Sequence, residues 1–292
     1  MPLRSGVVPM FATIHGVDFS GARRAGRNIW IATLTPILGD GEGLRVRLEA
    51  LCSLERLCGT SERSPALTHL VGLIKGSGNA LWALDFPFGL PVELFAPGSE
   101  WEDQHALARD WRSDAHAFGL HCLERARALG GPGHIRRITD SEVKTPFDCY
   151  HYRIIYQTFF GMRDVLGPLR DDARTAILPF QYGKKAAAAR VVLEACPSST
   201  LKRLGLPHQN YKQPAGGPLT RVRRLTRGII LDQLSSLVEI GEAHRRVIMR
   251  NPGGDALDAV IAAAGAAWSW REQDHRRIAR HARYPREGFI YG

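Results

Sequence analysis

The sequence has little that would anchor it in a membrane or hold a zinc ion. It contains no apolar run of about 18 residues, the length that a transmembrane helix needs. Its N-terminus lacks the basic segment and apolar stretch of a secretory signal. Its five cysteines are irregularly spaced without a CxxC pair, which argues against a zinc ribbon or finger. We therefore expect a cytoplasmic protein with free thiols and no membrane partner.

Lysine is also scarce. Of 39 basic residues only six are lysines, and with 29 acidic residues the net charge is +10. A basic balance favours polyanionic partners such as nucleic acid or nucleotides. An arginine-, alanine- and glycine-rich composition can also reflect genome composition alone, so the charge leaves nucleic-acid binding open. Oligomeric state is equally open.

A short apolar run that ends in an acid stands near the start of the chain. The segment 13–18 closes on Asp18, which Ser20 and Gly21 follow, and the next apolar run, 28–36, comes at hairpin distance. Such a run, closed by small residues, predicts a buried strand that carries an acid to the edge of a sheet.

A second apolar run has the same ending. Residues 80–84 are apolar throughout, as in a central strand covered on both faces, and Asp85 follows before a sharp exit rich in Pro and Gly. Ligands of open α/β sheets lie beyond the carboxyl ends of strands. We therefore expect Asp18 and Asp85 to share one site.

The remaining patterns predict the fold class. Further strands are expected at 44–52 and 189–194, five in all, and helices are expected at 64–76, 100–129, 152–166, 219–248 and 255–270. We predict a single α/β domain over residues 1–292, with a helical insertion at about 95–185 between the fourth and fifth strands.

Three more acids fit a common site. Glu194 ends the fifth predicted strand, and Asp255 and Asp258 lie three apart, on one face of an apolar helix. Burying Asp258 without a partner would cost several kcal/mol. If these acids meet Asp18 and Asp85, their mutual repulsion requires a cation, and oxygen ligands alone suit Mg²⁺ or Mn²⁺.

Each acid also has a purely structural explanation. Asp18 and Asp85 could accept hydrogen bonds within local turns, and Asp255 could favour the helix dipole. Glu194 could pair with a neighbouring arginine. Asp258 is the hardest of the five to explain in this way.

The insertion offers candidate substrate-binding groups. Phosphate is well bound by Lys and Arg and bases by aromatic stacking, so we expect Lys144 and Arg153, together with Ser20, to contact substrate. Aromatic residues that could stack on bases lie near Lys144 and Arg153 in the sequence: Phe147, Tyr150, Tyr152 and Tyr156. The same composition also describes an amphipathic helix docked on a core, and both interpretations stay open.

Five short segments together resemble a known family. The motifs at 15–22, 85–91, 194–197, 255–259 and 287–290 occur in an order and spacing similar to the DUF429 family, described as predicted nucleases of the ribonuclease-H-like fold. The resemblance extends over roughly residues 13–291. It implies a five-stranded mixed sheet, a divalent metal, and a carboxylate cluster of Asp18, Asp85, Glu194 and Asp258, with Asp255 beside it.

The hypothesis from sequence is a metal-dependent nuclease or phosphodiesterase that uses water as the attacking group. Asp18, Asp85 and Asp258 would hold Mg²⁺ or Mn²⁺, and Glu194 or Asp255 would complete a second metal site or orient water. One alternative is a phosphotransferase like the actin-like ATPases and sugar kinases, although a second phosphate-binding hairpin and an adenosine Gly-Gly motif are not evident. Another is a non-catalytic nucleic-acid-binding protein of the same fold.

Overall fold

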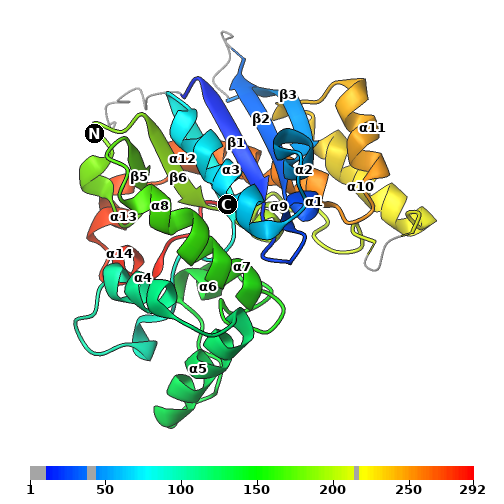
Figure 1. Cartoon of the computed structure of the whole chain (residues 1–292). Coiled ribbons are helices and arrows are strands. Elements are labelled where there is room, and N and C mark those ends of the chain that lie inside the picture. Colours follow the sequence, from blue (N-terminus) through cyan, green and yellow to red (C-terminus); the bar gives the residue numbers. More distant parts are fainter. Residues whose placement is uncertain (1–10, 38–43, 214–216) are drawn as a thin grey trace.

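The computed structural model describes residues 11–37, 44–213 and 217–292. Within them the chain forms an α/β structure around one mixed sheet of seven strands, in the order β5-β6-β4-β1-β2-β3-β7 (Figure 1). The strands are β1 (Thr13–Asp18), β2 (Trp30–Pro36), β3 (Val46–Ser53), β4 (Ala80–Asp85), β5 (Thr175–Ile177), β6 (Arg190–Glu194) and β7 (Val238–Glu239).

The direction of the strands determines where the acids can meet. β1 pairs antiparallel with β2 and parallel with β4, and β4 pairs parallel with β6. β2 and β3 form an antiparallel pair, whereas the two short edge strands, β5 and β7, run parallel to β6 and β3. Because β1, β4 and β6 are mutually parallel, their carboxyl ends lie at the same edge of the sheet.

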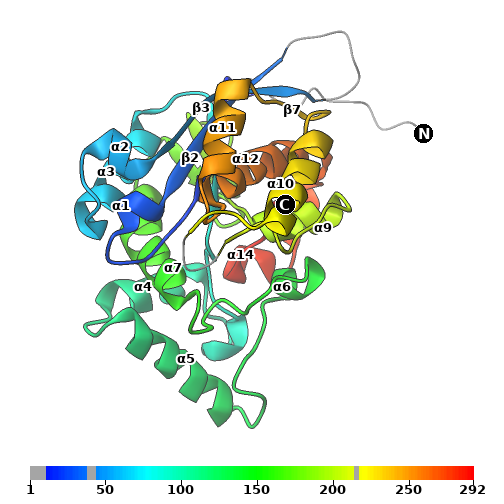
Figure 2. The same ribbon diagram turned by 90° about the vertical axis from the view of Figure 1, so that its right-hand side faces the viewer.

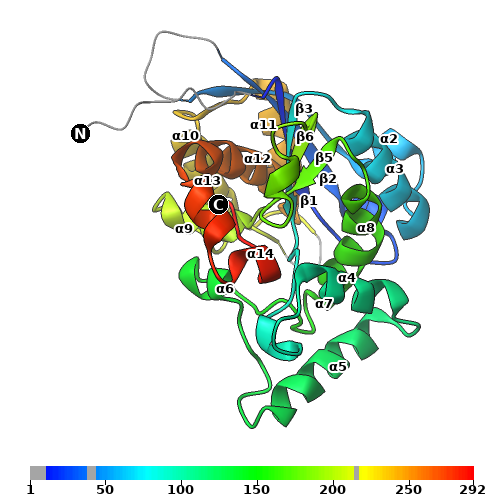
Figure 3. The same cartoon turned by 90° about the vertical axis from the view of Figure 1, so that its left-hand side faces the viewer.

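Helices cover both faces of the sheet. α12 packs across β1, β2 and β4 on one face with α10 and α11, and α1, α2 and α3 lie on the other (Figures 2 and 3). The helices are α1 (Ala25–Asn28), α2 (Leu54–Cys58), α3 (Arg63–Gly76), α4 (Trp101–Asp110), α5 (Ala115–Ala128), α6 (Ile138–Glu142), α7 (Ile155–Phe160), α8 (Gly167–Arg170), α9 (Pro197–Arg203), α10 (Arg221–Leu234), α11 (Glu242–Arg250), α12 (Asp255–Glu272), α13 (His275–Arg280) and α14 (Tyr284–Glu287). Short 3₁₀ turns at Val92–Leu94 and Tyr182–Lys184 and a π-helical turn at Gly161–Leu166 complete the set.

The alternation of side chains along the central strands creates two hydrophobic cores. Ile14 of β1 and Leu81 of β4 are buried against α12, whereas Val17 and Leu84 are buried on the α3 side. Side chains two apart share a face of a strand, so Asp18 follows Ile14 and Gly16 onto the face that α12 covers. The sheet thus presents the end of β1 to α12.

Gly16 allows α12 to approach the sheet closely. A Cβ atom added to Gly16 would lie 2.0 Å from the carbonyl oxygen of Ala259 and 2.5 Å from the backbone nitrogen of Ala263. The helix backbone therefore rests directly on β1, and only a residue without a side chain fits at position 16. Asp258, the neighbour of Ala259, is brought to the end of β1 by this contact.

The prediction of one continuous helix at 100–129 is wrong. The structure has two helices there, α4 and α5, because Asp114 begins a new helix and its carboxylate accepts a hydrogen bond from the Ala117 amide at 2.8 Å. Helices α4, α5, α6 and α7 of the insertion lie beyond the carboxyl ends of the strands, and α5 points away from the sheet, whereas α8 packs beside α3 (Figure 1). The insertion also contains β5, which pairs with β6, so it is not wholly helical.

Two other sequence predictions need correction. The predicted helix at 219–248 is divided into α10 and α11, because Val238 leaves the helix to pair with Val46 at the edge of the sheet. With β5 and β7 added, the sheet has seven strands rather than five. Two- and three-residue edge strands are too short to produce a periodic pattern in sequence. The single-domain prediction for 1–292 stays a prediction.

No helix in the described part of the chain is both long and apolar enough to cross a bilayer.

Candidate metal centre

Asp18 and Asp85 are neighbours because of strand register. They are paired positions at the ends of the parallel strands β1 and β4. Both are the last residues of strands that are mostly buried, so the apolar runs that form the centre of the sheet also fix the backbone positions of these two acids. The shared site that the sequence predicts is thereby formed at the carboxyl edge.

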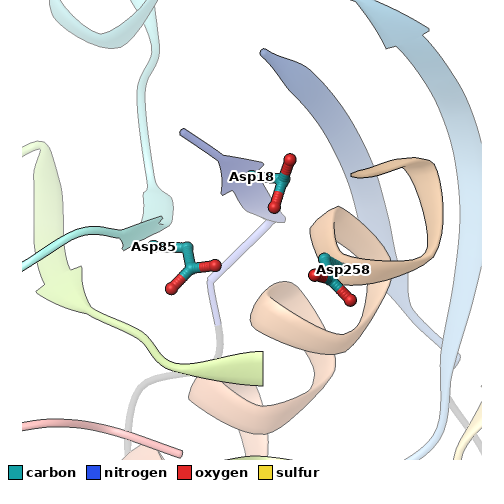
Figure 4. Close-up of side chains that lie close together, drawn as sticks. All are labelled: Asp18, Asp85 and Asp258. Atoms are coloured by element: carbon teal, nitrogen blue, oxygen red, sulfur yellow. The ribbon is translucent and has the colours of Figure 1, made fainter. Parts of the chain in front are cut away.

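Asp258 completes a cluster of three carboxylates. It lies in the first turn of α12, which starts after a left-handed turn at Gly254, and the Asn251 side chain accepts hydrogen bonds from the first amides of the helix. One carboxylate oxygen from each of Asp18, Asp85 and Asp258 lies within 4.8 Å of the others (Figure 4). Asp258 is 1% exposed and Asp18 is 9% exposed. The three acids come from a strand near the start of the chain, a strand in its first third and a helix near its end.

The cluster holds more negative charge than its surroundings readily accommodate. Burial, and then the Asp258 carboxylate, raise the pKa of Asp85 to about 8. The same two causes, in the same order, raise the pKa of Asp18 well above its usual range. Carboxylates this close cannot all ionise unless a cation is present.

One cation is supplied by the chain itself. The Nζ atom of Lys212 forms an ion pair with Oδ2 of Asp258, and the Tyr211 hydroxyl donates a hydrogen bond of 2.8 Å to Oδ1 of the same carboxylate. Burial lowers the pKa of Lys212, but the Asp258 carboxylate outweighs this and raises it well above its ordinary value. Both oxygens of Asp258 are thus occupied by groups from the loop between α9 and α10.

The residues present fit a divalent metal ion. The donors are oxygen atoms alone, they come from three separate elements, and the raised pKa values of Asp18 and Asp85 reflect charge that a cation would neutralise. Mg²⁺ and Mn²⁺ prefer such ligands. Since Lys212 is already paired with Asp258, a metal ion must share that carboxylate with the ammonium group or displace it.

The cluster opens into a pocket of about 220 Å³. Asp18, Asp85 and Asp258 line it together with Tyr211 and Lys212. Its other walls come from the turn after β4, from the start of α9 and from the insertion: Phe86, Pro87, Cys196, Pro197, Ser198, Pro146, Phe147, Ile154 and Gln157. Phe147 and Ile154 of the insertion therefore lie beside any substrate group that reaches the acids.

Glu194 lies at the end of β6, but its carboxylate is engaged elsewhere. Arg137, which is fully buried, contacts both Glu194 oxygens and also binds Asp140. The Phe88 amide donates a further hydrogen bond of 2.9 Å to Glu194. Glu194 therefore holds the turn that follows Asp85, and the arginine partner considered from sequence is present. Its predicted catalytic role stays a prediction.

Asp255 and Ser20 lie near the cluster with local partners of their own. Asp255 Oδ2 accepts a long hydrogen bond of 3.4 Å from Asn251, and burial raises its pKa. The Ser20 hydroxyl accepts a 3.3 Å hydrogen bond from the Ala22 amide, as in a local turn. Neither residue belongs to the group of acids whose oxygens lie within 4.8 Å of one another.

Lys144 and Arg153, the basic residues predicted to bind substrate, are both exposed on the insertion. The Lys144 carbonyl accepts a hydrogen bond from Lys202, so that this loop is tied to α9. The Arg153 guanidinium lies 5.5 Å from the ring centre of Phe147 and 5.7 Å from that of Tyr152. Arg153 therefore belongs to a group of aromatic residues whose member Phe147 lines the pocket.

Sequence reasoning missed Lys212, Tyr211 and Arg137. Lys212 is one of six lysines in the chain and directly follows a tyrosine in a polar loop, but nothing in that pattern indicates which acid it meets. Arg137 lies at the end of a loop, directly before the short helix α6, where no periodic pattern marks it as buried.

Comparison with known proteins adds no relative: no protein-family model, no curated protein and no solved structure matches this chain.

Proposed function

We propose that this protein is a divalent-metal-dependent hydrolase of phosphodiester bonds in nucleic acid or nucleotides. The observation that carries the proposal is the convergence of Asp18, Asp85 and Asp258, with oxygen atoms within 4.8 Å of one another, at the carboxyl edge of a sheet and at the base of a pocket. Carboxylate clusters of this kind hold the metal ions of many enzymes that cleave phosphate esters.

A bound Mg²⁺ or Mn²⁺ ion would supply positive charge that polarises a phosphoryl oxygen and makes water a better nucleophile. Asp18, Asp85 and Asp258 hold that ion. Lys212 adds a second positive charge at the same carboxylates, which favours an incoming phosphate group. Tyr211 fixes the Asp258 carboxylate by its hydrogen bond.

The strand order supports a ribonuclease-H-like interpretation of the fold. Without the two short edge strands, the sheet order is β3-β2-β1-β4-β6, with β2 alone opposed to the others. Asp18 at the end of β1, Asp85 at the end of β4 and Asp258 on α12 agree with the carboxylate cluster that the DUF429 resemblance implies. We therefore propose membership of that family.

Two features favour a polyanionic substrate. The net charge is +10 although the pocket contains three acids and a single basic residue, Lys212, so most of the basic residues lie elsewhere on the molecule. The walls of the pocket include Phe147 and Ile154, and Arg153 lies over the Phe147 ring. Apolar and aromatic walls beside a phosphate-binding centre suit a nucleotide better than inorganic phosphate.

The test is cleavage of labelled single-stranded and double-stranded DNA and RNA with Mg²⁺ or Mn²⁺, with EDTA as the blank. We expect the wild type to cleave nucleic acid and the Asp85→Asn and Asp258→Asn variants each to cleave it much more slowly. Loss of a residue that only supports a metal ligand reduces activity roughly 10- to 100-fold, and loss of a ligand itself should reduce it further. Asp110→Asn, at an exposed position that ends α4, is the matched control and should retain full activity. If both site variants cleave as well as the wild type, the proposal is wrong.

The two alternative functions predict different results. A phosphotransferase related to the actin-like ATPases would bind ATP and transfer phosphate without cutting nucleic acid. A non-catalytic binding protein would bind nucleic acid but show no cleavage with either metal, and Asp18→Asn would leave its binding unchanged.

A further inference from the structure

The insertion contains a second pocket, away from the acids. It has a volume of about 130 Å³ and is lined almost wholly by apolar atoms. It is lined by Leu120 and Leu123 of α5 and, from later in the insertion, by His134, Tyr150, Tyr152 and Ile155. α5 lies far out on the insertion, beyond the end of the sheet (Figures 1 and 3).

The aromatic rings in this pocket are held in fixed orientations. The His134 and Tyr150 rings are nearly parallel, 7° apart, with centres separated by 5.8 Å. The buried Asp148 carboxylate binds His134 Nδ1 at 2.9 Å, and the Tyr150 hydroxyl donates to the Gly133 carbonyl at 3.1 Å. A hydrogen bond at the edge of each ring thus sets its plane, and flat walls of this kind suit a flat ligand.

A row of stacked rings connects this pocket with the pocket that holds the acids. Phe147, which lines the acid pocket, stacks on His151 at 4.6 Å, and His151 packs on Tyr152 at 4.5 Å. Tyr152 lines the second pocket and is 65% exposed. The guanidinium of Arg153 lies beside both ends of this row, over Phe147 and over Tyr152. We call Phe147, His151 and Tyr152 the aromatic row.

We propose that the second pocket and the aromatic row bind the bases of a single-stranded nucleic acid whose phosphate lies at the acid cluster. The inference rests on the proposed action on nucleic acid and names its substrate class. Within the row the rings cover one another's faces, so bases stack on the surfaces that stay open: the exposed Tyr152 ring beside the second pocket at one end, and Phe147 in the acid pocket at the other. Arg153 provides positive charge for the phosphates between them. Stacking does not depend on the identity of the base, so the site selects unpaired bases rather than a sequence.

Three features distinguish this site from a docking surface for another protein. The pocket is small, at about 130 Å³, its aromatic walls are oriented by hydrogen bonds, and the aromatic row links it to Phe147 in the acid pocket. Duplex nucleic acid presents no free base faces along its length and therefore cannot use the row.

The experiment measures binding in EDTA, so that neither metal nor cleavage contributes. The probes are a fluorescently labelled single-stranded DNA oligomer of mixed sequence, the same oligomer annealed to its complement, and an oligomer of equal length made of abasic sites. We expect the wild type to bind the single strand more tightly than either of the others. Tyr152→Ala, and Leu120→Trp, which fills the pocket, should each raise the Kd for the single strand about 5- to 150-fold.

Matched controls isolate stacking from loss of structure. Tyr152→Phe keeps the ring and should bind as the wild type does, and Leu129→Trp adds the same bulk at an exposed position outside the pocket at the end of α5. Thermal unfolding of each variant shows whether it is folded. Equal Kd values for the single strand and the abasic oligomer, or unchanged binding by both Tyr152→Ala and Leu120→Trp, would overturn the inference.

The outcomes also separate this inference from the proposed function. Preference for unpaired bases without any cleavage would uphold the base site and refute the hydrolase. Cleavage that depends on Asp85, in a protein with no preference for unpaired bases, would uphold the hydrolase and refute the base site.

Discussion

Gly16 and Ala259 are in direct backbone contact, and this contact aligns Asp18 with Asp258. The space that a Cβ atom at Gly16 would need is already filled by the Ala259 carbonyl oxygen, 2.0 Å away. Asp18 lies two residues after Gly16 and Asp258 one residue before Ala259. The distance between two of the three acids is thus set by a glycine that has no chemistry of its own.

Gly16→Ala should damage both stability and metal binding. The added methyl group must push α12 away from β1, and overpacking of a well-packed core costs about 1–3 kcal/mol or more. We expect a lower denaturant midpoint, together with weaker Mn²⁺ binding by calorimetry, because Asp258 moves away from Asp18. Gly72→Ala, at an open position in α3, is the control and should not weaken metal binding. Wild-type stability and Mn²⁺ affinity in Gly16→Ala would contradict the close packing.

Metal binding should stabilise the wild type in a way that depends on the three acids. A ligand present at 100 times its Kd stabilises the folded state by about 2.7 kcal/mol. We expect Mn²⁺ to raise the melting temperature of the wild type and to leave that of Asp85→Asn unchanged. In EDTA the Asp85→Asn protein should be at least as stable as the wild type, because a buried repulsion is removed. An equal shift of both proteins by Mn²⁺ would place the metal elsewhere.

The metal-free protein should lose stability as the pH rises. Asp85 has its pKa raised from 3.8 to about 8 in the folded state, so between these values the folded protein binds a proton that the unfolded chain has released. The free energy of unfolding therefore falls as the pH increases through this range. Excess Mn²⁺ should weaken or reverse the trend, because metal binding requires the deprotonated acid. Urea titrations between pH 4 and pH 8 measure how the free energy of unfolding changes with pH, once with Mn²⁺ and once without it. Asp85→Asn, which cannot titrate at this position, should show a shallower slope in EDTA, and an unchanged slope would contradict the assignment.

Lys212→Met should have opposite effects on stability and on metal affinity. Removing the ammonium leaves the buried Asp258 with the Tyr211 hydroxyl but without its cation, so the protein should be less stable in EDTA. Mn²⁺ should bind this variant more tightly, because it no longer competes with a lysine for the carboxylate. Calorimetric titration gives the affinity and the number of ions bound. Lys202→Met, which loses a lysine of α9 outside the acid pocket, is the control, and weaker Mn²⁺ binding by Lys212→Met would contradict the competition.

Arg137→Met should be strongly destabilising without altering the metal ligands. It leaves Glu194 and Asp140 buried without their cation, and breaking a buried ion pair typically costs about 3–5 kcal/mol.

Glu194→Gln tests the predicted catalytic role of that acid. If Glu194 acts mainly on the turn after β4, this variant should lose stability but keep its affinity for Mn²⁺. Loss of Mn²⁺ affinity with unchanged stability would instead support a ligand role.

The sequence predicts those parts of the fold that long patterns encode. The apolar runs that end in Asp18 and Asp85 define the central strands, and the acid in an otherwise apolar helix marks Asp258. The meeting of Asp18 and Asp85 follows from the rule that parallel strands end at one edge, whereas Asp258 reaches them through the contact of α12 with Gly16. The edge strands β5 and β7 are too short to leave a pattern, and the interruption at Asp114 lies inside a stretch that looks continuously helical. Lys212 and Arg137 depend on tertiary contacts between distant segments, which no local pattern records.

Because β1 supplies Asp18 and α12 supplies Asp258, the centre unites residues separated by 240 positions. A ribosome must deliver residue 258 before any ion could be held by all three acids, so a nascent chain that stops short of α12 carries no complete centre. A protease cut that releases α12 would have the same effect on the finished protein. If the protein attacks nucleic acid as proposed, it stays inert until α12 has been added to the chain.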